Sequence, residues 1–218
     1  MTEDAQTGSG DVARGGVFGT GARNKNCRGI WLPADRNRGA FVASSCTAYH
    51  GPDGRGGSEL APSLAGQSSA VLWKQLEDFR SGMREWPVMN AVAKALAAED
   101  LPTVAAFLNH VGPRRSQCTP TRGAASALVE QGDIKRLIPP CAACHDQRNT
   151  HDVQMFAPRI DGQRADYLER QLLLFRAGWR RNDIYGHMRV VARSLDDVEV
   201  RQLADWYASS GTGLACSP

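Results

Sequence analysis

The sequence has no long apolar run: no stretch approaches the roughly 20 residues that a transmembrane helix needs, which excludes a membrane-spanning protein. The net charge is also low, since 26 basic and 23 acidic residues leave a net charge of +3. The basic residues are scattered, so we expect no nucleic-acid partner. Six cysteines are too few for a disulfide scaffold in 218 residues. The 42% hydrophobic content is typical of a globular protein.

The strongest organisational signal is an internal repeat with an offset of 96 residues. Residues 66–84, GQSSAVLWKQLEDFRSGMR, share nine identities with residues 162–180, GQRADYLERQLLLFRAGWR. A repeat of this length is too long for a solenoid and predicts two tandem domains, residues 1–112 and 113–218. Residues 111–123, rich in Pro, Gly, Arg and Ser, are predicted to be the linker.

Hydrophobic periodicity predicts helices, and no stretch shows the sustained alternation of a strand. One helix is expected over residues 68–81, with Gly82 as its C-cap. Two more are expected over 98–110, with Pro102 in the first turn, and over 196–209. These patterns predict an all-α fold.

One motif carries clear chemistry. Cys141-Ala-Ala-Cys144-His145 has the C-x-x-C-H spacing of covalent c-type haem attachment. Two thiols three residues apart on a helical turn can each form a thioether with a haem vinyl group, and the next residue presents its imidazole to the iron. A zinc or redox pair is the alternative, but a zinc site needs a second ligand pair at close spacing, and Cys118 and Cys216 are single.

A methionine is expected as the sixth iron ligand. Met188 follows His145 by 43 residues, in a loop between two predicted helices. Core filling is the alternative role of a lone methionine. Met89 stands at the equivalent place of the first repeat unit, which favours the ligand role. His187 and His151 could compete for the iron, although neither has a repeat equivalent.

These motifs together resemble the cytochrome c4-like di-haem proteins, which are tandem class I cytochrome c domains. The resemblance covers about residues 40–210 and implies an all-α fold, pseudo-twofold packing of two domains, two haems, a periplasmic location and electron transfer. The matching segments besides the cysteine motifs are residues 62–67, 75–82 and Met89 in the first unit, and residues 158–163, 171–178 and Met188 in the second.

Three features depart from the family. The first motif reads Cys46-Thr-Ala-Tyr49-His50, so a tyrosine replaces the second thiol. Asp146 follows the second motif, where glycine is usual. The family's short first helix resembles residues 10–15 here, yet about 30 residues, including Cys27, separate it from the motif. The sequence gives no role for residues 12–45 and no pairing for its three lone cysteines, Cys27, Cys118 and Cys216.

We expect haem at the first site as well, held by one thioether through Cys46, with His50 and Met89 as axial ligands. An empty pocket of haem size would be costly, because each Å3 of residual cavity costs about 24 cal/mol. Tyr49 is expected at the haem edge, where the second thioether would lie, with its hydroxyl near a polar partner. A relic domain that folds without cofactor is the alternative.

His/Met ligation fills both axial positions of the iron, so the motifs predict an electron carrier and not an enzyme. A di-haem peroxidase-like enzyme, or an electron-relay subunit of a dehydrogenase or oxidase complex, is the alternative. Expected partners are redox proteins such as a terminal oxidase, reductase or dehydrogenase, with any membrane association peripheral and through a partner. Thioether attachment in that family is linked to export, so we expect a signal peptide encoded upstream of residue 1.

Overall fold

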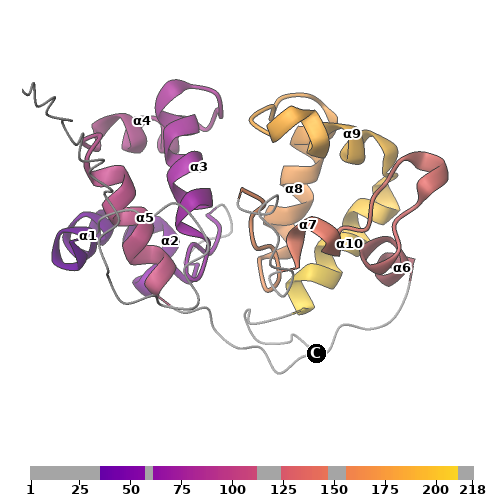
Figure 1. Ribbon diagram of the computed structural model, residues 1–218, viewed down its shortest axis with the longest axis horizontal. Coiled ribbons are helices and arrows are strands. Elements are labelled where there is room, and N and C mark those ends of the chain that lie inside the picture. The colour runs from indigo at the N-terminus through magenta and orange to yellow at the C-terminus, as the bar shows by residue number, and fades with distance from the viewer. Residues whose placement is uncertain (1–34, 57–60, 112–123, 147–155, 211–218) are drawn as a thin grey trace, which may run out of the picture.

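The computed structural model describes residues 35–56, 61–111, 124–146 and 156–210. Over these residues it consists of helices and turns, with one isolated β-bridge between Asp133 and Ile138. The helices form two units that lie side by side, as Figure 1 shows. The expected all-α fold is confirmed, and no described helix is long and apolar enough to span a bilayer.

Each unit consists of short helices joined by loops and 3-10 turns. The first unit contains α1 (Arg36–Ala43), η1 (Ser44–Cys46), α2 (Thr47–His50), η2 (Pro52–Gly54), α3 (Ser69–Ser81), α4 (Pro87–Ala95) and α5 (Asp100–His110). The second contains α6 (Ala124–Glu130), η3 (Ile134–Arg136), α7 (Ala142–His145), α8 (Ala165–Arg176), η5 (Ile184–Gly186), α9 (His187–Ser194) and α10 (Asp197–Ser209).

The longer helices begin and end where local chemistry sets their limits. Helix α3 ends at Gly82, whose φ of 82° is the left-handed conformation of a glycine C-cap. Helix α10 begins with a capping box, in which Asp196 and Glu199 each accept a hydrogen bond from the other's backbone N–H. Pro102 lies near the start of α5, where its missing N–H costs no hydrogen bond. The helices predicted over 68–81, 98–110 and 196–209 are therefore confirmed to within two residues.

Helix α1 directly precedes the first motif, through the single turn η1. The expectation that about 30 residues separate the first helix from the motif is therefore wrong, because residues 36–43 form a helix directly before the motif. Residues 10–15, which were expected to be the first helix, lie outside the described residues. Asp35 caps α1 by accepting hydrogen bonds from the backbone N–H groups of Asn37 and Arg38.

Helix α1 packs closely against α5. Arg38 donates two hydrogen bonds to Asp100, at 2.8 and 2.7 Å, and this pair lowers the pKa of the carboxyl group. A Cβ atom at Gly39 would lie 2.8 Å from Cβ of Phe107 and 2.9 Å from the carbonyl oxygen of Thr103. The two helices can approach this closely because residue 39 has no side chain.

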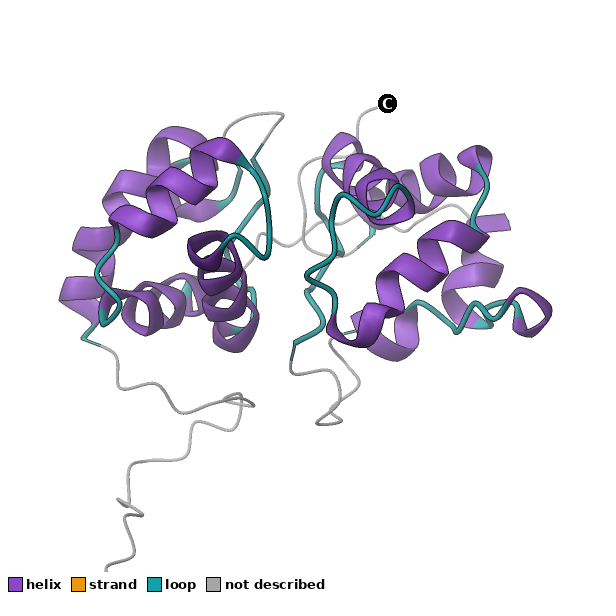
Figure 2. Ribbon diagram, turned by 90° about the horizontal axis from the view of Figure 1, so that it is seen from above, coloured by secondary structure: helices purple, strands orange, loops and turns teal. Residues whose placement is uncertain are grey.

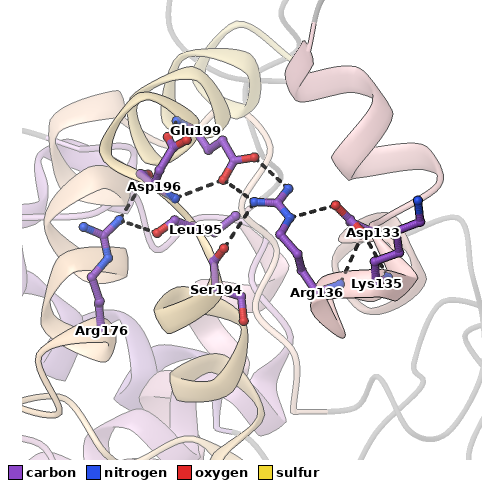
Figure 3. A network of polar contacts seen from close by, with 8 residues as sticks. All are labelled: Asp133, Lys135, Arg136, Arg176, Ser194, Leu195, Asp196 and Glu199. Atoms are coloured by element: carbon purple, nitrogen blue, oxygen red, sulfur yellow. Dashed lines mark hydrogen bonds and ion pairs between the residues drawn. The ribbon is translucent and has the colours of Figure 1, made fainter.

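The turn before the second motif is fixed by Arg136. Figure 3 shows its guanidinium donating to both carboxylate oxygens of Glu199 in α10, at 2.9 and 2.7 Å, and to Asp133 at 2.7 Å. Asp133 also accepts hydrogen bonds from the backbone N–H groups of Lys135 and Arg136. The η3 turn is thereby held against α10.

Each unit has its own apolar core. The first is formed by Val42, Ala43, Leu72, Val104, Ala105 and Leu108. The second is formed by Ala125, Leu128, Val129, Ile138, Leu168, Leu195, Val200, Leu203, Ala204 and Tyr207.

Reciprocal hydrogen bonds join the two units, whose loops face each other in Figure 2. Gln163 accepts from the backbone N–H of Ser63 at 2.8 Å and donates to its carbonyl oxygen at 3.1 Å. Gln67 makes the same two contacts with the backbone of Arg159, accepting from its N–H at 2.9 Å. Both glutamines are buried. Because the two pairs are related by the repeat offset, the predicted pseudo-twofold packing is confirmed.

Candidate functional site

One cavity of about 1510 Å3 extends over both units and is lined by residues of both cysteine motifs. Most of its lining is apolar, including Leu72 and Phe79 in the first unit and Leu168 and Phe175 in the second. Its volume exceeds the roughly 300–1,000 Å3 of a pocket for one drug-sized ligand. The cavity therefore has room for two large apolar groups.

The second motif lies on one helical turn. Cys141 is the N-cap of α7, and Cys144 and His145 end that helix. The imidazole Nδ1 of His145 lies 2.8 Å from the carbonyl oxygen of Pro158. Both thiols and the imidazole line the cavity.

The first motif has the same geometry. His50 ends α2, is buried, and places Nδ1 2.9 Å from the carbonyl oxygen of Pro62. Cys46 precedes α2 and lines the cavity. Tyr49, at the position of the second thiol, lies at the cavity wall and is 52% exposed.

These contacts set the tautomer of both histidines. A carbonyl oxygen only accepts hydrogen bonds, so Nδ1 must carry the proton and donate it. Nε2 then keeps its lone pair free for a metal, and the carbonyl fixes the orientation of the ring. Burial lowers the pKa of both His50 and His145, against the opposing effect of the carbonyl hydrogen bonds, so both rings are neutral at pH 7. This is the protonation state of a metal-ligating imidazole.

The two methionines lie in helices. Met89 is in the first turn of α4, after Pro87 at its N-terminus, and Met188 is the second residue of α9. Both line the cavity. The loop expected around Met188 is therefore wrong, because α9 is a single short amphipathic helix that begins one residue earlier, at His187.

Repeat-related arginines hold the helices that carry the methionines. Arg80 donates to the carbonyl oxygen of Leu96, after α4, at 3.1 Å. Arg176 makes the same contact with Leu195, after α9, at 3.1 Å (Figure 3). The recurrence of this arginine in the repeat is thereby explained by packing.

The thiols of the described residues belong to no metal-binding cluster. Burial raises the pKa of Cys46 and raises that of Cys141 to about 11, so both are protonated at neutral pH. Within the described ranges, no three His, Cys, Asp or Glu side chains form a group that could hold a metal ion. The zinc alternative therefore has no ligand set in this part of the chain.

A polar cluster that the sequence analysis did not predict joins the two units. Arg84 donates to Gln75 of its own unit at 2.6 Å and to Gln171 of the other unit at 3.0 Å. Arg180 mirrors it, donating to Gln171 at 2.7 Å and to Gln75 at 3.3 Å. Tyr167 also accepts a hydrogen bond from Arg84, at 3.1 Å. The recurrence of two glutamines on otherwise apolar helix faces was the signal that could have revealed it.

Burial and the neighbouring charge of Arg84 lower the pKa of Arg180 to about 9. Both guanidinium groups line the cavity. Haem carries two propionate carboxylates, which such cationic donors suit. The apolar walls, the two neutral imidazoles and these arginines therefore fit a haem group in each unit.

His151, Cys27, Cys118, Cys216 and the predicted linker beyond residue 111 lie outside the described residues. His187 is exposed at the start of α9, and its ring contacts that of Tyr185.

Known proteins resemble this chain over most of its length. A thiosulfate dehydrogenase electron acceptor from Stutzerimonas stutzeri is 38% identical over 177 residues, which cover 78% of this chain and 81% of that protein. Cytochrome c4 from Pseudomonas aeruginosa is 33% identical over 150 residues, covering 68% of this chain and 75% of that protein. No family model matches the sequence.

Solved structures agree with these relatives. Reduced recombinant cytochrome c4 from Pseudomonas stutzeri matches with a TM-score of 0.73 and 28% identity, over 82% of this chain and 100% of that one. Thiosulfate dehydrogenase TsdBA from Marichromatium purpuratum matches with a TM-score of 0.70 and 32% identity. That match covers 81% of this chain and 40% of TsdBA, so this chain spans less than half of TsdBA's length.

Proposed function

This chain belongs to the cytochrome c4-like family and is an electron-carrying c-type cytochrome; from this premise we propose that it works in the periplasm and accepts electrons from a redox enzyme such as a dehydrogenase. The relative named as an electron acceptor for thiosulfate dehydrogenase supports a dehydrogenase as donor. A terminal oxidase or reductase would then take the electrons away. The proposed domains are residues 1–112 and 113–218, with no enzymatic activity in either.

The observation that carries this proposal is the matched pair of histidine–carbonyl contacts, one in each unit, facing one cavity. In the second unit, Cys141 and Cys144 would hold haem c by two thioethers, with His145 and Met188 as axial ligands. The haem iron, when bound, supplies the one-electron couple. The protein fixes the imidazole ring, excludes water with its apolar wall, and offers Arg84 and Arg180 to negative charge at the domain boundary.

In the first unit, Cys46 would hold haem by a single thioether, with His50 and Met89 as axial ligands. The support is structural equivalence: His50 contacts a proline carbonyl oxygen as His145 does, and Met89 lies in the first turn of a short helix as Met188 does. Tyr49 stands where the second thiol would be and contributes to the cavity wall. A site saturated by histidine and methionine leaves no position for a substrate, which favours a carrier over a peroxidase-like enzyme.

The axial ligands are tested by replacing Met188 with alanine. The oxidised variant should lose the near-infrared sulfur-to-iron band of the second site, because that band requires a thioether on the iron. Met83→Ala is the matched control, since Met83 is 58% exposed and precedes α4. Survival of the full band in Met188→Ala would exclude Met188 as a ligand. A carbon monoxide complex of the reduced wild-type protein would instead favour the enzyme alternative.

Attachment is tested by intact-protein mass spectrometry under denaturing conditions. We expect two haem additions in the wild type and one in Cys46→Ala. A single addition that disappears in the double variant Cys141→Ala/Cys144→Ala would refute the one-thioether site. Iron content of the native protein then distinguishes an empty first site from haem held there without a covalent bond.

A further inference from the structure

An exposed apolar patch lies on the loop that joins α8 to α9, which is orange in Figure 1. Trp179, Ile184 and Tyr185 are 74%, 40% and 90% exposed, and all three are also among the residues that line the cavity. We call these residues, with the exposed Arg181 between them, the α8–α9 patch. Met188 follows Tyr185 by three residues, so a protein bound to this patch would stand close to the proposed second haem.

The charge around the patch is positive. Arg181 and Arg193 are exposed, and neither has an acidic partner within the described part of the chain. Arg193 reaches the loop at Gly178. Asp183, the acidic residue of the loop, has a buried side chain that pairs with Arg189 at 2.8 Å. The surface therefore presents apolar side chains with cations beside them and no free carboxylate from this loop.

The repeat provides an internal comparison. At the equivalent positions of the first unit, Met83 stands for Trp179 and Glu85 stands for Arg181, so the charge is reversed. The offset between the repeats changes from 96 to 99 across this loop, because the second unit has three additional residues. Tyr185 lies in this longer loop. The patch is thus a feature of the second unit and is not inherited from the shared fold.

The backbone also holds Tyr185 outward under strain. Its φ of 55° and ψ of 15° are left-handed, a conformation that bulky residues rarely adopt. Gly186 follows with φ of 74°. A turn alone would favour glycine or asparagine at residue 185, so an exposed tyrosine there indicates a use for its ring.

We propose that the α8–α9 patch is the docking surface for a redox protein whose own surface has an apolar centre and an acidic rim. Trp, Tyr and Arg are the residue types that carry most binding energy at interfaces. Positive charge accelerates the encounter with an acidic partner, whereas Glu85 repels the same partner from the first unit. The proposal rests on the proposed function: one electron passes between the proteins, so one is oxidised as the other is reduced.

The test uses the oxidised, haem-loaded full chain and an acidic flavodoxin hydroquinone as reductant, mixed by stopped flow. Arg181→Glu should lower the second-order rate constant at low ionic strength about 5- to 10-fold and weaken its salt dependence. Trp179→Met and Tyr185→Gly should each raise the dissociation constant, obtained from rate saturation, about fivefold or more. Met83→Ala, the matched change in the first unit, should alter neither constant.

Dithionite reduction and the reduced visible spectrum report the haem sites independently of docking. If the wild type shows no haem spectrum or is not reduced by dithionite, the proposed function fails. If all variants are reduced by dithionite and also react with flavodoxin like the wild type, the docking inference is wrong. Sedimentation supplies a further check, since a dimer of this chain that dissociates in Tyr185→Gly would assign the patch to self-association and overturn the proposal. Arg181→Glu changes one exposed side chain, so the test stands even if Trp179→Met does not fold.

Discussion

Replacing Gln163 with alanine should weaken the docking of the two units. The side chain is buried and makes two hydrogen bonds to the backbone of Ser63, at 2.8 and 3.1 Å. Each neutral hydrogen bond contributes about 1 kcal/mol, and a buried backbone group left without a partner costs about 1–3 kcal/mol. The variant loses two hydrogen bonds and leaves the backbone N–H and carbonyl of Ser63 without partners. Water that enters the gap offsets part of this cost. We therefore expect the free energy of unfolding to fall by about 2–4 kcal/mol.

Urea unfolding of the haem-loaded protein measures this, with far-UV circular dichroism and haem absorbance followed together. The matched control is Gln202→Ala on the exposed face of α10, which should change the free energy by less than about 0.5 kcal/mol. The double variant Gln67→Ala/Gln163→Ala should lower the free energy of unfolding by less than the sum of the two single changes, because the first change already weakens the interface that the second one affects. A Gln163→Ala protein that unfolds within about 0.5 kcal/mol of the wild type would refute the reasoning.

Three further outcomes follow from the packing of each unit. Gly39→Ala should lower the free energy of unfolding by about 1–3 kcal/mol in urea, because the new methyl group would overlap Phe107; a gain in stability would show that α1 and α5 are not so close. The hydrogen bonds and charge of Arg38 lower the pKa of Asp100, so the stabilisation from this carboxylate is present above the ordinary aspartate pKa and is lost as the pH falls through the lowered pKa. Asp100→Asn should therefore make the melting temperature fall less steeply with decreasing pH below about pH 4. An unchanged slope would remove Asp100 as its cause. Arg136→Gln should increase the rate at which a lysine-specific protease cleaves after Lys135, because the turn loses its hydrogen bonds to Glu199. Gel electrophoresis measures the rate, and equal rates in the variant and the wild type would mean that other contacts hold the turn.

The repeat made most of the architecture predictable. Apolar residues at helical spacing located α3, α5 and α10, and Gly82 and Asp196 marked helix limits because their chemistry is local. The family resemblance supplied the two-domain packing. The cysteine motif located His145 on a helical turn at the cavity, as its spacing required.

Features that depend on distant partners could not be predicted in the same way. Helix α1 has little amphipathic pattern and therefore gave no periodic signal in the sequence. It is held by the Arg38–Asp100 pair and by the close approach at Gly39, and both of these contacts require α5. The carbonyl partners of the two histidines come from residues 12 and 13 positions away and leave no side-chain signature. Arg84 and Arg180 were visible as repeat identities, but their role appears only when the two units meet.

The glutamine contacts between the units have an evolutionary consequence. Gln67 and Gln163 each bind a main-chain N–H and carbonyl, and the residues that provide them are chemically unlike: Arg159 in one case and Ser63 in the other. Recognition of this kind does not depend on the side chain of the residue recognised, so any substitution at Ser63 or Arg159 that keeps the backbone N–H, which excludes proline, leaves both hydrogen bonds possible. After a gene duplication, each half could therefore diverge in surface chemistry while still fitting its twin. A hybrid in which one half is exchanged for that of a relative should assemble, provided that the glutamine and the side chains that Arg84 and Arg180 bind in the other unit are kept.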